Sequence, residues 1–126
     1  MARLLALAAA ALLLAPVAAP AAPAYKPVSF AATDGVTLRG RLWARGGTAV
    51  ILSHMFGTDQ SIWFDLAARL AGQGHTVLTF DFRGIGASGG QLVIRRVSRD
   101  TLGAVHFVRR RSPSKVVLVG ASMGGT

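Results

Sequence analysis

Residues 115–125 read KVVLVGASMGG, and this stretch says more about the chain than any other. Its first half, Lys115–Val119, is dominated by branched apolar side chains, which is typical of a strand covered on both faces of a parallel sheet. Its second half contains Gly120-Ala121-Ser122-Met123-Gly124, a G-x-S-x-G pattern that runs through Gly125 toward an expected helix. The pattern is informative in this setting, because a strand–turn–helix joint holds the serine on a strained bend with its hydroxyl exposed.

Each residue type in this pattern has a physical role at such a bend. Gly120 and Gly124 leave room where the strand and the helix crowd together. The oxygen of Ser122 would sit near the amino end of a helix, whose dipole and free N–H groups favour developing negative charge. Ser122 is therefore the candidate nucleophile. A glycine-rich strand-to-helix turn with a capping serine remains the plain alternative.

Upstream of this stretch, apolar patterning predicts alternating strands and helices. The expected strands are Val28–Ala31, Val36–Trp43, Thr48–Ser53 and His75–Phe80. Helices are expected over 61–73 and 97–111, the second with Leu102 facing inward. Two hairpin strands followed by a β–α–β–α–β run predict the α/β class, with a three-layer, mostly parallel sheet.

Two loops follow the buried strands that precede the motif. His54-Met55-Phe56-Gly57 comes after the first, and residues 81–88, DFRGIGAS, come after the second. Together with VILSH at 50–54, the Asp59-Gln60…Trp63 segment and the motif at Ser122, they resemble the N-terminal half of an α/β-hydrolase-fold serine hydrolase. The motifs occur in the order of that family, and the resemblance spans roughly residues 27–126.

The resemblance implies a mechanism and assigns residues to it. Ser122 would be the nucleophile, and the backbone N–H groups of Met123 and Phe56 would form the oxyanion hole. Gly120 and Gly124 would be the glycines of the nucleophile elbow, and His54 would be a structural residue of its loop. Met55 stands where the family usually has glycine. The implied reaction is acyl transfer on ester or lipid-like substrates, with amides or peptides next, and it needs no metal or organic cofactor.

The expected catalytic triad is incomplete in this chain. Serine hydrolases of this fold supply their residues in the order Ser, acidic residue, His. No acidic residue and no histidine follows Ser122, whereas His54, His75 and His106 all precede it. We therefore expect the chain to be the front half of a hydrolase, with an incomplete sheet, and to be inactive alone.

Residues 1–24 are laid out as a secretory signal peptide. Arg3 supplies the positive start, Leu4–Leu14 is an uninterrupted apolar run, and small residues at 22–24 suit cleavage near Ala24. The run is too short for a stable membrane span, which needs about 20 apolar residues. We expect an exported protein, periplasmic or secreted, with one domain over residues 25–126.

Composition excludes several other classes. No cysteine is present, so a disulfide scaffold, a thiolate metal site and a cysteine nucleophile are excluded. The formal net charge is +9, but the basic residues are dispersed along the sequence, apart from 95–96 and 109–111, and no nucleic-acid-binding motif accompanies them. We therefore expect a small-molecule ester or amide substrate as the partner and no nucleic acid. The sequence does not indicate an oligomeric state.

Two alternatives to a hydrolase are open. Residues 84–89 spell G-x-G-x-x-G after a strand, as in dinucleotide-binding oxidoreductases, but no helix pattern begins directly after them and the next strand ends without an acidic residue. The other alternative is an exported binding or interaction module that keeps the α/β fold without catalysis.

Overall fold

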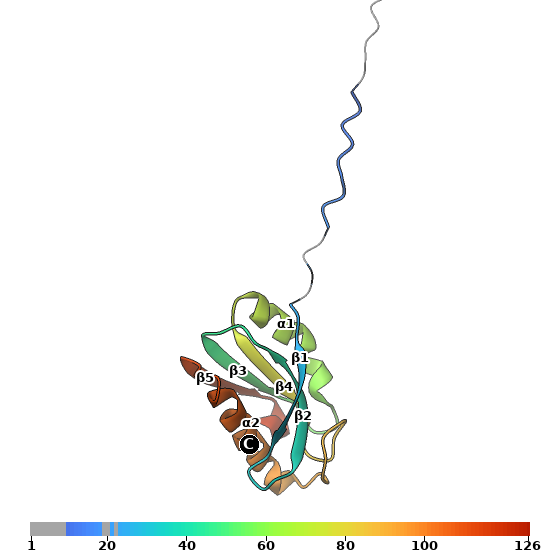
Figure 1. Cartoon of the computed structure of the whole chain (residues 1–126). Coiled ribbons are helices and arrows are strands. Elements are labelled where there is room, and N and C mark those ends of the chain that lie inside the picture. Colours follow the sequence, from blue (N-terminus) through green and yellow to red (C-terminus); the bar gives the residue numbers. More distant parts are fainter. Residues whose placement is uncertain (1–9, 19–20, 22) are drawn as a thin grey trace, which may run out of the picture.

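The computed structural model describes residues 10–18, 21 and 23–126, and the folded part is one five-stranded sheet with two main helices (Figure 1). The strand order is β1-β2-β4-β3-β5. The strands are β1 (Lys26–Ala31), β2 (Thr37–Trp43), β3 (Thr48–Ser53), β4 (Thr76–Phe80) and β5 (Lys115–Gly120). β3, β4 and β5 are mutually parallel, whereas β1 and β2 are an antiparallel hairpin joined to β4. The predicted α/β class with a mostly parallel sheet is confirmed.

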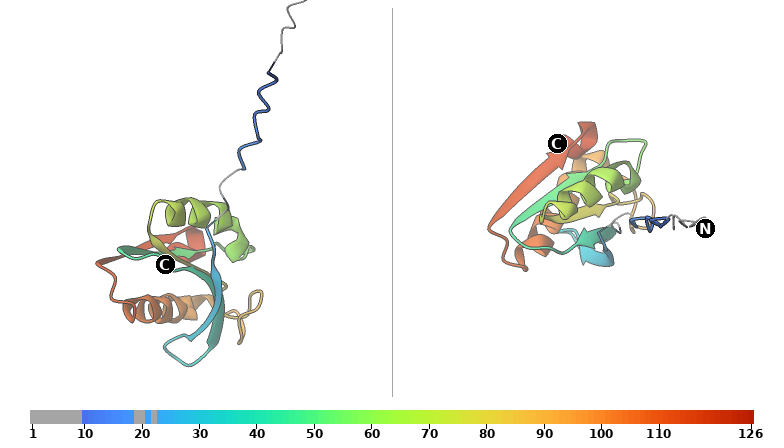
Figure 2. Two further views of the ribbon diagram at one scale, coloured as in Figure 1. Left: turned by 45° about the horizontal axis from the view of Figure 1, so that its top comes forward. Right: turned by 90° about the horizontal axis from the view of Figure 1, so that it is seen from above.

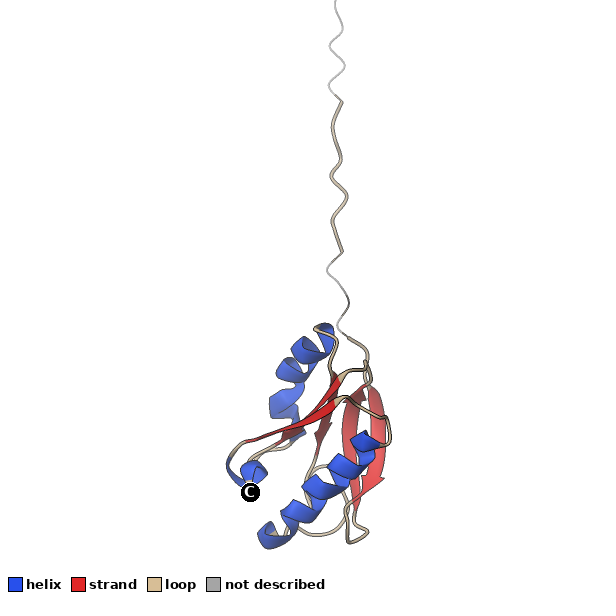
Figure 3. Ribbon diagram, turned by 90° about the vertical axis from the view of Figure 1, so that its left-hand side faces the viewer, coloured by secondary structure: helices blue, strands red, loops and turns tan. Residues whose placement is uncertain are grey.

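The two helices cover opposite faces of the sheet, which gives three layers (Figures 2 and 3). α1 (Phe64–Gly72) follows a short 3₁₀ turn, η1 (Gln60–Trp63), and α2 (Val97–Arg109) follows another, η2 (Ile94–Arg96). A last 3₁₀ turn, η3 (Ser122–Gly125), follows β5. Parallel neighbours in a sheet require such crossovers, and both crossovers here are helical.

Burial follows the apolar runs of the sequence. Every residue of β4 is buried, and so are five of the six residues of β3, so these two strands form the centre of the molecule. On the α1 side, Trp43, Leu52 and Val77 pack with Ala67 and Ala71. The larger cluster lies on the α2 side, and its most buried members include Leu38, Ile51, Leu78, Phe80, Phe82, Ala104 and Val108.

A row of aromatic rings crosses the larger cluster from α2 to the far end of the sheet. Phe107 stacks on Phe30 at a centroid distance of 4.9 Å, and Phe30 meets Phe80 edge-on at 5.8 Å. Phe80 and Phe82 follow at 5.1 Å, and Phe82 meets the ring of His54 at 4.9 Å. Edge-to-face and offset pairs of this kind stabilise a core beyond their buried area. The row therefore fixes the position of the loop that begins at His54.

Several element boundaries differ from the sequence prediction. The helix expected over 61–73 is divided into η1 and α1, and the helix expected over 97–111 ends at Arg109. Leu102 was expected to face inward but is 47% exposed, because the small residues Gly103 and Ala104 form the buried face of α2 instead. Asp59 caps η1 by accepting a hydrogen bond of 2.8 Å from the Ser61 amide.

The expected leader, residues 1–24, lies partly outside the described residues. Its described stretch, 10–18, has no regular secondary structure, and Leu12, Leu13 and Leu14 are exposed. Within the part of the chain that the structure describes, no helix combines the length and apolar character needed to cross a membrane.

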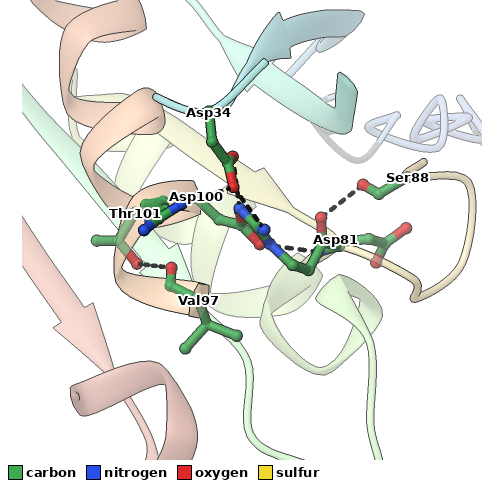
Figure 4. A network of polar contacts seen from close by, with 8 residues as sticks. Asp34, Asp81, Ser88, Val97, Asp100 and Thr101 are labelled. Carbon is green, nitrogen blue, oxygen red and sulfur yellow. Dashed lines mark hydrogen bonds and ion pairs between the residues drawn. The ribbon is translucent and has the colours of Figure 1, made fainter. Parts of the chain in front are cut away.

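A buried ion-pair network centred on Arg83 joins three segments at one end of the sheet (Figure 4). The Arg83 guanidinium donates to Asp100 on α2 at 2.9 and 2.6 Å, and to Asp34 in the β1–β2 turn at 2.9 and 2.8 Å. The backbone amide of Arg83 also donates to Asp100 at 2.9 Å. Arg99 adds an outer contact to Asp34 at 3.3 Å. The network fixes the hairpin, the loop after β4 and α2 relative to one another.

This network shifts the proton affinity of its members. Hydrogen bonds from Arg83 hold the pKa of Asp34 well below its usual range, and those from Asp34 and Asp100 raise the pKa of Arg83 further above its usual value. A carboxyl group whose pKa is lower in the folded state than in the unfolded state stabilises the fold at pH values above its unfolded-state pKa. This contribution is lost as the pH falls through its folded-state pKa. The contact between Asp34 and Arg83 therefore persists at every pH near neutrality.

Replacing Arg83 tests the network. Arg83→Met leaves Asp100 buried without a cation, so we expect the free energy of unfolding to fall by about 3–5 kcal/mol. Arg99→Met removes a half-exposed partner of the same network, and the free energy of unfolding should change by less than about 1 kcal/mol. Urea unfolding followed by circular dichroism measures both variants, and equal losses in the two would contradict a special role for Arg83.

Candidate active site

Ser122 lies at the bend between β5 and η3, with its side chain exposed. Ala121 before it is still extended, with φ −115° and ψ 129°, whereas Ser122 has a φ of +51°. A residue with a side chain rarely adopts this left-handed conformation, because its Cβ then crowds the backbone. The chain therefore turns sharply at Ser122 and carries its side chain outward.

The glycines on either side of Ser122 are required by space. A Cβ on Gly120 would lie 1.9 Å from the carbonyl oxygen of Gly124, and one on Gly124 would lie 2.3 Å from that of Ser53. Both obstacles are backbone atoms, which cannot rotate away as a flexible side chain can. The spacing of the pattern thus reflects two close backbone approaches, one within the bend and one between the bend and β3.

Backbone pairing holds the bend against the loop after β3. Gly120 is in register with Ser53, and the Ala121 amide donates to the Ser53 carbonyl at 3.3 Å. β3, β4 and β5 all end at this side of the sheet, which we call the carboxyl edge. Since the ends of parallel strands meet at one edge, the loops after β3 and β5 are neighbours there, the arrangement typical of ligand sites in α/β proteins.

The two residues predicted to supply oxyanion donors lie in these neighbouring loops. Phe56, in the loop after β3, has a side chain that is 61% exposed, and Met123, in η3, is 6% exposed. Among the hydrogen bonds of the described residues, none is donated by the backbone amide of either residue. Neither amide therefore has a hydrogen-bond partner among the described residues.

His54 is a structural residue in this geometry. It is fully buried, its Nε2 lies 3.1 Å from the Phe82 amide, and its Nδ1 lies 2.9 Å from the Met55 carbonyl oxygen. An amide can only donate and a carbonyl can only accept, so Nε2 serves as the acceptor and Nδ1 as the donor. Both nitrogens are thus engaged in joining the loop after β3 to the loop after β4.

Asp81 organises the neighbouring loop and is also structural. Its carboxylate accepts from the Gln60 amide at 3.0 Å, the Gln60 side chain at 3.2 Å and the Ala87 amide at 3.3 Å. Ser88 donates to the Asp81 carbonyl at 2.5 Å and accepts from the Arg39 amide at 2.9 Å (Figure 4). The loop after β4 is therefore tied to both η1 and β2.

The other two histidines lie away from Ser122. His75 precedes β4 and so lies at the opposite edge of the sheet, where its amide donates to Leu70. His106 is exposed near the end of α2. No histidine of the described residues is therefore placed to take a proton from Ser122.

The glycine-rich segment after β4 does not open a helix. Residues 84–89 form a compact turn in which Gly84 and Gly89 hydrogen-bond to each other at 2.9 Å, and the next helical residue is Ile94. A dinucleotide fingerprint needs its glycines at the start of a helix. The described residues also contain no group of three or more His, Cys, Asp or Glu side chains that could hold a metal ion.

A shallow cavity of about 300 Å³ lies beside η3. It is lined by Ile94, Arg95, Ser98 and Thr126, the last of which follows Gly125 directly. Ser122 is not one of the lining residues.

Comparison with known proteins gives a consistent set of relatives. A family model described as serine aminopeptidase, S33, matches residues 46–126. The uncharacterized protein YfhR of Escherichia coli K12 is 34% identical over 110 residues, which cover 78% of this chain and 38% of YfhR. The thiohydrolase aneE of Aspergillus aculeatus is 32% identical over 111 residues, which cover 80% of this chain and 35% of that protein. The chain thus spans less than two fifths of the length of these curated relatives.

Two solved structures share the fold. The esterase Pf2001 of Pyrococcus furiosus is 26% identical, with a TM-score of 0.71, over 80% of this chain and 44% of that one. The α/β hydrolase GrgF from Penicillium sp. sh18 is 32% identical, with a TM-score of 0.72, over 81% of this chain and 39% of that one.

A pair of neighbouring glycines tests the close approach at the bend. In Gly124→Ala the new methyl group meets the backbone of Ser53, the last residue of β3, and of His54, so we expect the free energy of unfolding to fall by about 1–3 kcal/mol. In Gly125→Ala the nearest atom is 3.6 Å away, an ordinary contact, and the change should stay within about 0.5 kcal/mol. Thermal unfolding of the two variants measures the difference, and equal stability would show that the bend is looser than described.

Proposed function

The chain belongs to the α/β-hydrolase family described as serine aminopeptidase, S33, and on this premise we propose that it carries the nucleophilic half of a serine hydrolase. Ser122 is the proposed nucleophile. It attacks a carbonyl carbon, forms an acyl-enzyme, and releases the acid when water attacks in turn. The first leaving group is the alcohol, thiol or amine of the substrate.

The observation that carries the proposal is the conformation of Ser122. Its φ of +51° and its exposed side chain, between two glycines that admit no Cβ, are the features that the nucleophile of such a hydrolase requires. A positive φ is not sufficient by itself, because Ser112 in the turn between α2 and β5 has the same value. Position supports Ser122, since it stands at the carboxyl edge beside two unengaged amides.

The amides of Met123 and Phe56 are the proposed oxyanion hole. Two backbone donors aimed at the developing oxyanion stabilise the tetrahedral intermediate without any rearrangement at the moment of reaction. Their loops are held by rigid neighbours, namely the Gly120–Ser53 register and the two hydrogen bonds of His54. These supports keep the donor positions fixed when a substrate binds.

The general base and its acidic partner are proposed to come from outside the 126 residues. His54 has both nitrogens engaged, and His75 lies at the other edge of the sheet. Without a base, the Ser122 hydroxyl is a weak nucleophile at neutral pH. The chain alone is therefore proposed to be inactive.

Esters and thioesters are the proposed substrates, with amides next. The names of two relatives, an esterase and a thiohydrolase, support esters and thioesters, and the description of the family as serine aminopeptidase supports amides. A binding module without catalysis is the second candidate function, and it is favoured by one observation: no histidine of the described residues is placed to serve Ser122.

Export is proposed on the sequence of residues 1–24. A short, positively charged amino-terminal region, an apolar run and small residues at 22–24 support a leader cleaved near Ala24.

Labelling tests the nucleophile. In the protein expressed from its whole reading frame, a fluorophosphonate probe should label Ser122, and Ser122→Ala should abolish labelling and lower ester turnover by several orders of magnitude. Ser112→Ala is the matched control and should leave both unchanged. A whole protein that folds but is not labelled would contradict the serine mechanism and favour the binding module.

Amino-terminal sequencing tests export. When the chain is expressed with a functional secretion system, the mature protein should begin within a few residues of Tyr25. Ala22→Leu should block this processing, because a large side chain does not fit the small-residue requirement of the cleavage site, whereas Ala18→Leu should not. A mature protein that retains Met1–Ala24 and stays in the cytoplasm would refute the proposal.

A further inference from the structure

Basic side chains from several separate segments of the sequence, among them the consecutive arginines 109–111, gather at one end of the folded molecule. This end is the edge at which β3, β4 and β5 begin, opposite the carboxyl edge. Six exposed cations lie there, and we call them the basic end: Lys26, Arg45, Arg109, Arg110, Arg111 and Lys115. Strand register and loop contacts bring them together, since Lys115 pairs with Thr48, the Arg45 amide bonds to Thr76 and the Ser114 amide bonds to Gly47.

All five acidic residues lie toward the other end. Asp34, in the turn after β1, Asp81, just after β4, and Asp100, in the first turn of α2, surround Arg83 and its loop. Asp59 follows β3 and Asp65 begins α1, so they also belong to the carboxyl edge. The ion pairs among the described residues all engage Asp34 or Asp100, and none engages a cation of the basic end. The molecule therefore carries a one-sided positive charge.

Two shallow cavities open on the basic end. One, of about 400 Å³, is lined by Arg109 and Lys115 together with the hydroxyl-bearing Ser112 and Ser114. The other, of about 210 Å³, is lined by Arg45, Arg111 and Thr76. The first cavity combines a guanidinium and an ammonium group with serine hydroxyl groups, and the second has two guanidinium groups, all of them donors that bind phosphate oxygens. The Thr76 hydroxyl is already paired with Gly46 and the Arg45 amide.

The apolar leader joins the fold at this same end. The Trp43 indole donates to the Pro23 carbonyl at 3.2 Å, and the Arg45 guanidinium donates to the Ala24 carbonyl at 3.3 Å. Residues 10–18 lie outside the folded part (Figure 1), and Leu12, Leu13 and Leu14 among them are exposed. An apolar segment and a cluster of unpaired cations thus share one face.

We propose that, in the precursor that still carries residues 1–24, the basic end docks onto the surface of an anionic phospholipid bilayer, with headgroup phosphates seated in its two cavities. Cations near such a surface are attracted by its negative potential, and the apolar leader is already at the face that meets the membrane. Nucleic acid also presents phosphate groups, but it has no apolar interior into which the leader could insert. β5 is about 20 Å long and runs from the basic end to Ser122, so the candidate active site faces the water, away from the bilayer.

Vesicle binding by two charge-matched variants tests the proposal. Arg109→Gln/Arg111→Gln removes two exposed arginines from the basic end, one lining each cavity. Arg95→Gln/Arg96→Gln removes two exposed arginines from η2, which directly precedes the other end of α2. The full chain and both variants are sedimented with phosphatidylcholine vesicles that either contain or lack phosphatidylglycerol, and circular dichroism checks that all three proteins share one fold.

The basic-end variant should bind anionic vesicles about thirty-fold more weakly, because each cation near the surface strengthens binding about fivefold. The other variant should stay within about twofold, because its arginines lie further from the surface than the Debye length of about 8 Å. Binding to pure phosphatidylcholine, which depends on the leader, should be equal in all three proteins. Equal losses in both variants, or no loss in either, would overturn the proposal. Displacement of the bound chain by duplex DNA at concentrations that leave the vesicles intact would overturn it in favour of a nucleic-acid surface.

Discussion

One buried guanidinium determines how the parts of this molecule meet. Arg83 is held by two carboxylates from different elements, Asp34 of the hairpin turn and Asp100 of α2. An arginine buried to this degree is stable only because both partners are present and its hydrogen bonds are satisfied. The loop that carries Arg83 also contains Phe82, whose amide fixes His54 and with it the loop after β3. The geometry of the carboxyl edge thus depends on a charge cluster that takes no part in the proposed reaction.

The candidate site itself is built almost entirely of backbone. The bend brings backbone so close to Gly120 and Gly124 that only glycine fits there, and the register with Ser53 holds the bend. The amides of Phe56 and Met123 have no partner among the described residues. A site made this way is rigid before any substrate arrives, which is the condition for efficient electrostatic stabilisation of an oxyanion.

The sequence was sufficient for the strands and for the bend. Continuous apolar runs such as Thr48–Ser53 have few alternatives to a buried strand, and G-x-S-x-G after such a run directed attention to Ser122. It did not predict that Leu102 is exposed, because the small residues beside it let another face of α2 pack closely on the sheet. The Arg83 cluster also escaped prediction, since its acidic partners are 49 and 17 residues away and no spacing rule links them. The basic end was not predicted either, because strand register and loop contacts are needed to bring Lys26, Arg45 and Lys115 beside the consecutive arginines 109–111.

The link between Asp34 and Arg83 also constrains how the polypeptide is made. Both strands of the hairpin are synthesised early, yet Asp34 finds its partner only after the first crossover and β4 have been synthesised, and that partner is completed only by Asp100. The amino-terminal hairpin can therefore form while the chain is still on the ribosome, but its ion pair to the rest of the fold cannot. The loop between Asp34 and Arg83 must close before this contact can stabilise the fold. The contact that ties the hairpin to the rest of the fold is therefore complete only once α2 has been synthesised.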